Sequence, residues 1–145
     1  MKKEHFMLII FSVIIIVVVA LNLVDLAEDE VDFGKLYKFP ILVGEKTYLI
    51  LVGSNCSSKP EVSFFGLGKS VLVDFRDNQE NVFCNITIPA DLIWGELSVI
   101  NKYYELSNAE YYQISTGSNH FFHFIFSQTG LVEHFEFRGT EGVIS

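Results

Sequence analysis

From Val31 onward, the dominant period of the apolar residues is two, which is the period of a β-strand and not of a helix. Residues 82–88 carry the pattern most clearly, because four apolar side chains fall on one face: Val82, Cys84, Ile86 and Ile88. The other face carries Phe83, Asn85 and Thr87. Such a strand is typical of a sheet with one face on a core and one in water. This periodicity restricts the chain after residue 31 to an all-β fold.

The β-rich segments are short, and turn residues separate them at spacings of roughly 8–12 residues. Nine segments are expected as strands: 36–43, 47–52, 61–65, 70–75, 82–88, 96–100, 111–115, 120–127 and 131–138. Pro40 lacks an amide donor, so the first segment is expected at the edge of a sheet. Pro89 ends the fifth segment, and residues 90–94 are expected to form a single helical turn. We therefore predict an all-β, immunoglobulin-like antiparallel β-sandwich.

Two pairs of segments are predicted to be β-hairpins. The first two segments are joined by residues 44–46 (Gly-Glu-Lys), and the last two by residues 128–130 (Gln-Thr-Gly). In the last pair, one face is rich in phenylalanine and the other carries His123 and His134. These histidines are expected to meet on the outer face, as ordinary polar surface residues and not as metal ligands.

Residues 6–24 form an apolar stretch interrupted only by Ser12 and Asn22. As a helix this stretch would span about 28 Å, close to the thickness of the hydrocarbon core of a bilayer. Lysines precede it and acidic residues follow it, so we predict a single-pass cell-membrane anchor with the C-terminal part outside. Cleavage as a secretory signal and a pilin-type leader are the alternatives. The expected division is an anchor or signal at 1–27, an acidic stalk at 28–35, an extracellular domain at 36–140 and a tail at 141–145.

Two further features agree with a location outside the cytoplasm. Asn55 and Asn85 each begin an Asn-x-Ser/Thr sequence, the acceptor signal for N-linked glycans, so both are candidate glycosylation sites. Cys56 and Cys84 are the only cysteines in the chain, and a disulfide between them suits an oxidising compartment. Two separate buried thiols are the alternative.

Residues 83–89 (Phe-Cys-Asn-Ile-Thr-Ile-Pro), followed by Leu92, Ile93 and a glycine, resemble a β-sandwich module of archaeal cell-surface proteins. In that module a Phe-Cys-x-Val-Thr-Ile-Pro strand leads into a short Leu-Leu-x-Gly turn. The aromatic run at 120–126 and the run at 132–140 are similar to its later strands. Members often anchor at the C-terminus, whereas this chain has its apolar segment at the front. The resemblance implies an immunoglobulin-like domain at a cell surface and no particular reaction.

Charge and motif spacing exclude several classes of function. The chain has 18 Asp and Glu against 10 Lys and Arg, so its net charge of −8 argues against a nucleic-acid partner. Residues 66–70 (Gly-Leu-Gly-Lys-Ser) end like a phosphate-binding loop, but a strand follows where that motif needs a helix, so no nucleotide is expected. Acidic pairs such as Glu133 and Glu136 fall on opposite strand faces, a poor geometry for acid–base catalysis. We expect no enzyme, no metal and no cofactor.

Four tyrosines flank the segment 105–110: Tyr103, Tyr104, Tyr111 and Tyr112. A tyrosine outside the core suits contact with carbohydrate or protein, because its apolar ring ends in a polar group. Partial burial at the end of a sheet is the alternative.

We predict a non-enzymatic, membrane-anchored cell-surface protein that displays its domain for interaction, with another surface protein or a glycan as partner, or for envelope structure. An accessory subunit of a membrane, secretion or pilus-like assembly and a secreted binding domain are the alternatives.

Overall fold

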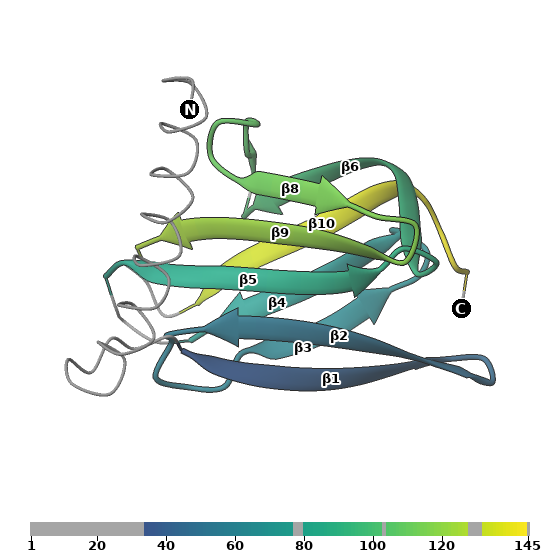
Figure 1. The fold of residues 1–145 in the computed structure, drawn as a ribbon, viewed down its shortest axis with the longest axis horizontal. Coiled ribbons are helices and arrows are strands. Elements are labelled where there is room, and N and C mark those ends of the chain that lie inside the picture. Colours follow the sequence, from purple (N-terminus) through teal and green to yellow (C-terminus); the bar gives the residue numbers. More distant parts are fainter. Residues whose placement is uncertain (1–33, 77–79, 103, 128–131, 145) are drawn as a thin grey trace, which may run out of the picture. The chain divides into compact units, whose positions relative to one another are not determined.

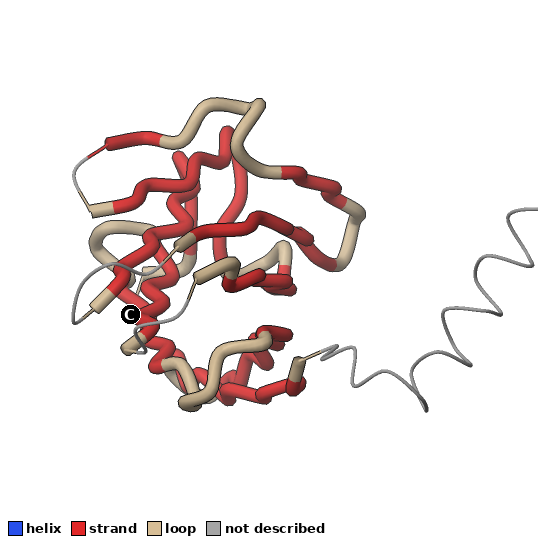
Figure 2. The backbone as a smooth tube through the Cα atoms, turned by 90° about the vertical axis from the view of Figure 1, so that its left-hand side faces the viewer, coloured by secondary structure: helices blue, strands red, loops and turns tan. Residues whose placement is uncertain are grey.

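The computed structural model describes residues 34–76, 80–102, 104–127 and 132–144. The predicted anchor, Tyr103 and the predicted turn at 128–130 lie outside the described residues. Within the described ranges the chain consists of strands joined by turns and loops (Figure 2). No helix there is long and apolar enough to cross a membrane.

The described strands form two five-stranded antiparallel sheets, which confirms the all-β class (Figure 1). In spatial order, the first sheet holds β1 (Lys35–Val43), β2 (Lys46–Ser54), β5 (Val82–Pro89), β9 (Asn119–Phe126) and β8 (Tyr112–Ser115). The second holds β3 (Glu61–Phe65), β4 (Ser70–Phe75), β10 (Glu133–Gly142), β6 (Ile93–Asn101) and β7 (Tyr104–Glu105). The strands thus extend slightly beyond the predicted domain limits of 36 and 140.

The first predicted hairpin is confirmed. β1 and β2 pair with Val43 opposite Lys46, so Gly44 and Glu45 form a two-residue turn. Gly44 has a φ of +63°, a conformation that glycine adopts without steric penalty and that suits tight hairpins. β1 lies at the edge of its sheet, as Pro40 predicts, because proline has no N–H for a further strand.

The second predicted hairpin is wrong. β9 lies in the first sheet between β5 and β8, whereas β10 lies in the second sheet between β4 and β6 (Figure 1). The phenylalanine-rich faces of the two strands therefore oppose one another across the core, with the ring centroids of Phe124 and Phe135 4.5 Å apart. This arrangement removes both faces from water, which a side-by-side pairing alone would not do. His123 and His134 consequently lie on the outer faces of different sheets and cannot meet.

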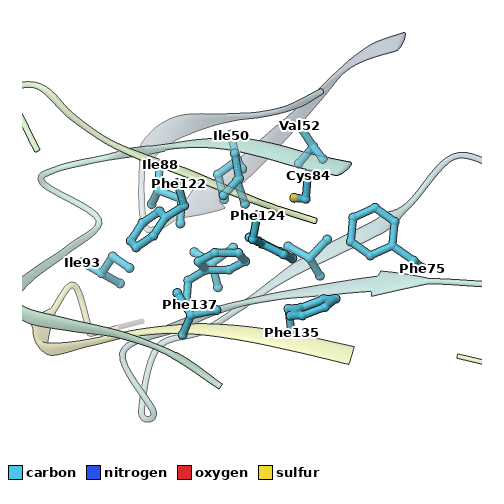
Figure 3. Close-up of a cluster of buried hydrophobic side chains, with 14 of the residues drawn as sticks. Ile50, Val52, Phe75, Cys84, Ile88, Ile93, Phe122, Phe124, Phe135 and Phe137 are labelled. Atoms are coloured by element: carbon cyan, nitrogen blue, oxygen red, sulfur yellow. The ribbon is translucent and has the colours of Figure 1, made fainter. Parts of the chain in front are cut away.

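The core lies between the sheets, and phenylalanine rings from both sheets pack against one another within it (Figure 3). The ring centroids of Phe122 and Phe137 are 5.0 Å apart, and those of Phe75 and Phe126 are 4.9 Å apart. Aliphatic side chains from both sheets fill the spaces around the rings, among them Ile50, Val52, Val71, Val73, Ile88 and Ile93. Burying each such side chain stabilises the fold by about 1.5–3 kcal/mol relative to leaving it exposed.

β5 alternates as predicted, with its four apolar side chains buried and Asn85 exposed. The single helical turn expected at 90–94 is wrong: residues 90–92 form a hydrogen-bonded turn, in which the Leu92 N–H donates to the Pro89 carbonyl over 3.0 Å, and Ile93 already begins β6. The glycine-containing segment after β3 forms a turn into β4, as expected in place of a phosphate loop. There the Lys69 N–H donates to the Gly66 carbonyl over 3.1 Å.

Candidate functional site

The loop between β7 and β8, residues 106–111, is bordered by three cavities. Their volumes are about 330, 450 and 320 Å³, and residues of the loop line each of them. The first lies between this loop, β9 and β10, and the other two lie toward β8. Three of the predicted tyrosines, Tyr104, Tyr111 and Tyr112, thus border concave surface, which is where a sandwich can enclose part of a ligand.

We call the first the aromatic cavity, because four aromatic residues line it: Tyr104, Phe124, Phe126 and Phe135. Its lining also includes two polar side chains from the second sheet, Asn101 of β6 and Glu133 of β10. Both are almost fully buried, with 7% and 6% of their surface exposed. A carboxylate and an amide at such depth need hydrogen-bond partners or ionic partners.

Within the described chain, only some of the polar side-chain atoms of Asn101 and Glu133 have a hydrogen-bond partner. Asn101 Nδ2 donates to Glu133 Oε1 over 3.1 Å. Lys102 Nζ lies 3.1 Å from Glu133 Oε2 and forms an ion pair with it, without the alignment of a hydrogen bond. Among the described residues, Asn101 Oδ1 has no hydrogen-bond donor although it is buried. The lining of the cavity therefore combines aromatic side chains with two enclosed acceptor atoms, Asn101 Oδ1 and Glu133 Oε2, and such acceptors suit hydroxyl or amide donors.

The loop beside the cavity is held by its own hydrogen bonds. The Ser107 N–H donates to a Glu110 carboxylate oxygen over 2.7 Å, and the Glu110 N–H returns a bond to the Ser107 carbonyl over 2.9 Å. The Leu106 N–H donates to the Val99 carbonyl of β6 over 2.8 Å. These bonds fix the rim of the aromatic cavity, which limits the entropy lost when a ligand binds.

The predicted tyrosines are divided between the cavities. Tyr104, 56% exposed, lines the aromatic cavity, whereas Tyr112, 63% exposed, lines the other two. Tyr111 is half-buried and packs on Phe122, with ring centroids 6.1 Å apart. Burial, and then the Glu105 carboxylate, raise the pKa of the Tyr111 phenol above its ordinary value.

Asn101 and Glu133 were not identified from the sequence, although both carry a recognisable signal. Glu133 is two residues before the buried Phe135, and Asn101 is two residues after the buried Val99. A polar residue in phase with the inward face of a strand must be buried, and burial of a polar group at a strand end marks a candidate site.

The two cysteines are both buried near the start of β5. Ser54 pairs with Cys84, and Cys56 follows two residues later, its N–H donating to Ser54 Oγ over 3.1 Å. Burial raises the pKa of the Cys84 thiol, and the neighbouring Cys56 raises it further. The disulfide between them stays a prediction.

This prediction can be checked by alkylating the protein with iodoacetamide and measuring its mass. The native protein is expected to take no label, because both sulfurs are buried and a thiolate is needed for alkylation. Denatured protein is also expected to take none until a reductant is added, after which both cysteines are labelled. Labelling of the denatured protein without reductant would show that the disulfide is absent.

The histidines of the wrong hairpin have separate partners. His123 Nδ1 bonds Asn85 Oδ1 on the outer face of the first sheet, and His134 Nδ1 bonds Asp74 on the second. Among the residues that the structure describes, no group of three or more His, Cys, Asp or Glu side chains is placed to hold a metal ion.

No protein-family model, curated protein or solved structure matches the chain. The resemblance of residues 83–89 to the archaeal surface module therefore stays a prediction. What the chain binds has to be argued from the geometry of the aromatic cavity and its rim.

Proposed function

We propose that this protein is a non-enzymatic, membrane-anchored surface protein whose immunoglobulin-like sandwich binds a partner through the aromatic cavity. The observation that carries the proposal is the buried Asn101 Oδ1, which has no donor within the described chain and belongs to a cavity with aromatic walls. A buried acceptor of this kind is destabilising unless water or a ligand satisfies it.

A sugar ring is the ligand class that fits these groups best. Its hydroxyls would donate to Asn101 Oδ1 and to the Glu133 carboxylate once these enclosed side chains turn toward the cavity, and its apolar face would lie on the Tyr104 ring. An organic cation fits less well, because Lys102 already neutralises Glu133. The partner is accordingly a carbohydrate displayed by another surface molecule.

The test is a titration of the full chain with glucose, galactose, mannose and N-acetylglucosamine, followed by backbone amide NMR. One of these sugars is expected to shift the amide signals of Asn101, Glu133 and the 106–111 loop. Tyr104→Ala is expected to weaken that binding about tenfold, because it removes the exposed ring from the cavity rim. Tyr104 is mostly exposed, so the variant should fold normally.

Tyr112→Ala is the matched control, since Tyr112 is equally exposed but lies outside the aromatic cavity. It is expected to bind the sugar as the natural protein does. Equal affinity in the Tyr104→Ala variant, or a response to n-butylammonium and to none of the sugars, would contradict the proposal.

A further inference from the structure

The outer face of the first sheet exposes several large apolar side chains. Seven of its large apolar side chains are exposed: Leu36, Leu42, Leu49, Tyr112, Ile114, Phe121 and Ile125. The inward residues of the same strands form the core, so alternation places these seven on the side away from it. Extended apolar patches on soluble domains are normally covered by another group.

Asn85 lies in the middle of this face. Across the sheet, Gly53 of β2, Asn85 of β5, His123 of β9 and Tyr112 of β8 stand opposite one another in a row. Asn85 is exposed and begins the acceptor sequence Asn-Ile-Thr. The strand period also puts Phe83 and Thr87 on the same face, directly on either side of it.

The neighbours of Asn85 leave room for a group on its side-chain nitrogen. On one side of Asn85, the ring nitrogen Nδ1 of His123 forms a hydrogen bond with Asn85 Oδ1. On the other side is Gly53, which has no side chain, and a Cβ built there would lie 3.9 Å from Asn85 Nδ2. The amide nitrogen therefore has open space above β2, in a sheet where the flanking positions carry side chains.

Asn55, the other acceptor sequence, is engaged differently. Its Nδ2 donates to the Asn81 carbonyl over 3.1 Å, and its Oδ1 accepts the Phe83 N–H over 2.9 Å. Its side chain is only partly exposed, and Cys56, the next residue, is buried. The Asn55 side chain thus joins the end of β2 to the start of β5 and is poorly placed to carry a large group.

We propose that Asn85, and not Asn55, carries an N-linked glycan that covers the outer face of the first sheet. In the transfer step, a bond forms between Asn85 Nδ2 and the anomeric carbon of an oligosaccharide carried on a lipid phosphate. The bond from that carbon to the phosphate oxygen breaks, the nitrogen loses one proton, and the lipid phosphate leaves. The proposal rests on the extracellular location given under the proposed function.

The experiment expresses the full chain in cells that glycosylate secretory proteins and maps the attached glycans by peptide mass spectrometry. Asn85 is expected to be occupied and Asn55 empty, and Thr87→Val is expected to abolish the modification while keeping Asn85. E45N provides the control, because it creates the acceptor sequence Asn-Lys-Thr in the exposed β1–β2 turn.

The E45N control distinguishes failure of the glycan proposal from failure of the extracellular location. An empty Asn85 together with an occupied E45N site would overturn the glycan proposal and leave the extracellular location standing. If both sites are empty, the domain does not reach the glycosylating compartment, and the location falls together with the glycan. Occupancy of Asn55 without Asn85 would also overturn the proposal.

A separate measurement tests whether the glycan covers the apolar outer face of the first sheet. Unglycosylated Thr87→Val protein is expected to bind the dye anilinonaphthalene sulfonate at least about twofold more than the glycosylated protein, because the apolar face is then open to it. Equal dye binding would overturn the covering role. Dimerisation of the glycosylated protein through this face would do the same, since a second copy would then be the group that covers it.

Discussion

Replacing Phe137 by alanine is expected to lower the free energy of unfolding by about 4 kcal/mol. Phe137 is fully buried on β10, in the middle of the second sheet, and its ring centroid lies 5.0 Å from that of Phe122 and 6.0 Å from that of Phe124. The truncation removes packing from both sheets at once and leaves a cavity that the crossing strands cannot close. Since small domains are stable by only about 5–15 kcal/mol, much of the margin would be lost.

The measurement is equilibrium unfolding in urea, followed by the change in fluorescence of Trp94. Phe65→Ala serves as the control, because Phe65 lies on the edge strand β3 and is about half exposed. It is expected to lower the free energy of unfolding by less than about 1 kcal/mol. Similar losses in the two variants would show that Phe137 does not lie in the main core.

Strand positions could be predicted from the sequence because alternation is a local property. In β5 the buried and exposed residues follow the predicted phase from Val82 to Ile88, and the turn after β1 follows from Gly44. Each of these features depends on residues within a few positions of one another. Local steric and hydrophobic preferences therefore suffice to determine them.

The sheet to which each strand belongs could not be predicted in the same way. β9 and β10 both present phenylalanine on one face, and the alternation within each strand is the same whether the strands pair side by side or oppose one another across a core. Phe124 and Phe135 take the second arrangement. Which arrangement forms depends on the other strands that pair with β9 and β10, and most of these partners are far away in the sequence.

The residues of the candidate site also differ in whether local sequence is enough to predict them. Tyr104 and Tyr112 could be identified because their position beside a polar, acidic segment already predicts exposure. Asn101 and Glu133 each signal burial by their phase, but their contact depends on the pairing of β6 with β10, in which Asn101 stands opposite Phe135. A site built from residues that pairing brings together cannot be read from either segment alone.

That pairing also accounts for the second large effect, which is expected at Gly139. The register of the pairing between β6 and β10 shifts between Gly139 and Glu141, as in a β-bulge. The Gly139 N–H donates to the Lys69 carbonyl over 3.0 Å. A Cβ on Gly139 would lie 2.6 Å from the carbonyl oxygen of Trp94 and 2.7 Å from that of Glu141. Both contacts are with backbone, so relief requires β6, which carries Trp94, to move away from β10, and the bulge of β10 itself, which carries Glu141, to change shape.

Gly139→Ala is therefore expected to lower the free energy of unfolding by about 3 kcal/mol. Gly117→Ala is the matched control, because a Cβ there meets no atom within 4 Å. It is expected to leave the urea midpoint nearly unchanged. The two midpoints coinciding would mean that β6 and β10 can separate without loss. In that case the contact between Asn101 and Glu133, which depends on the same pairing, would not be rigid enough to hold the aromatic cavity in one shape.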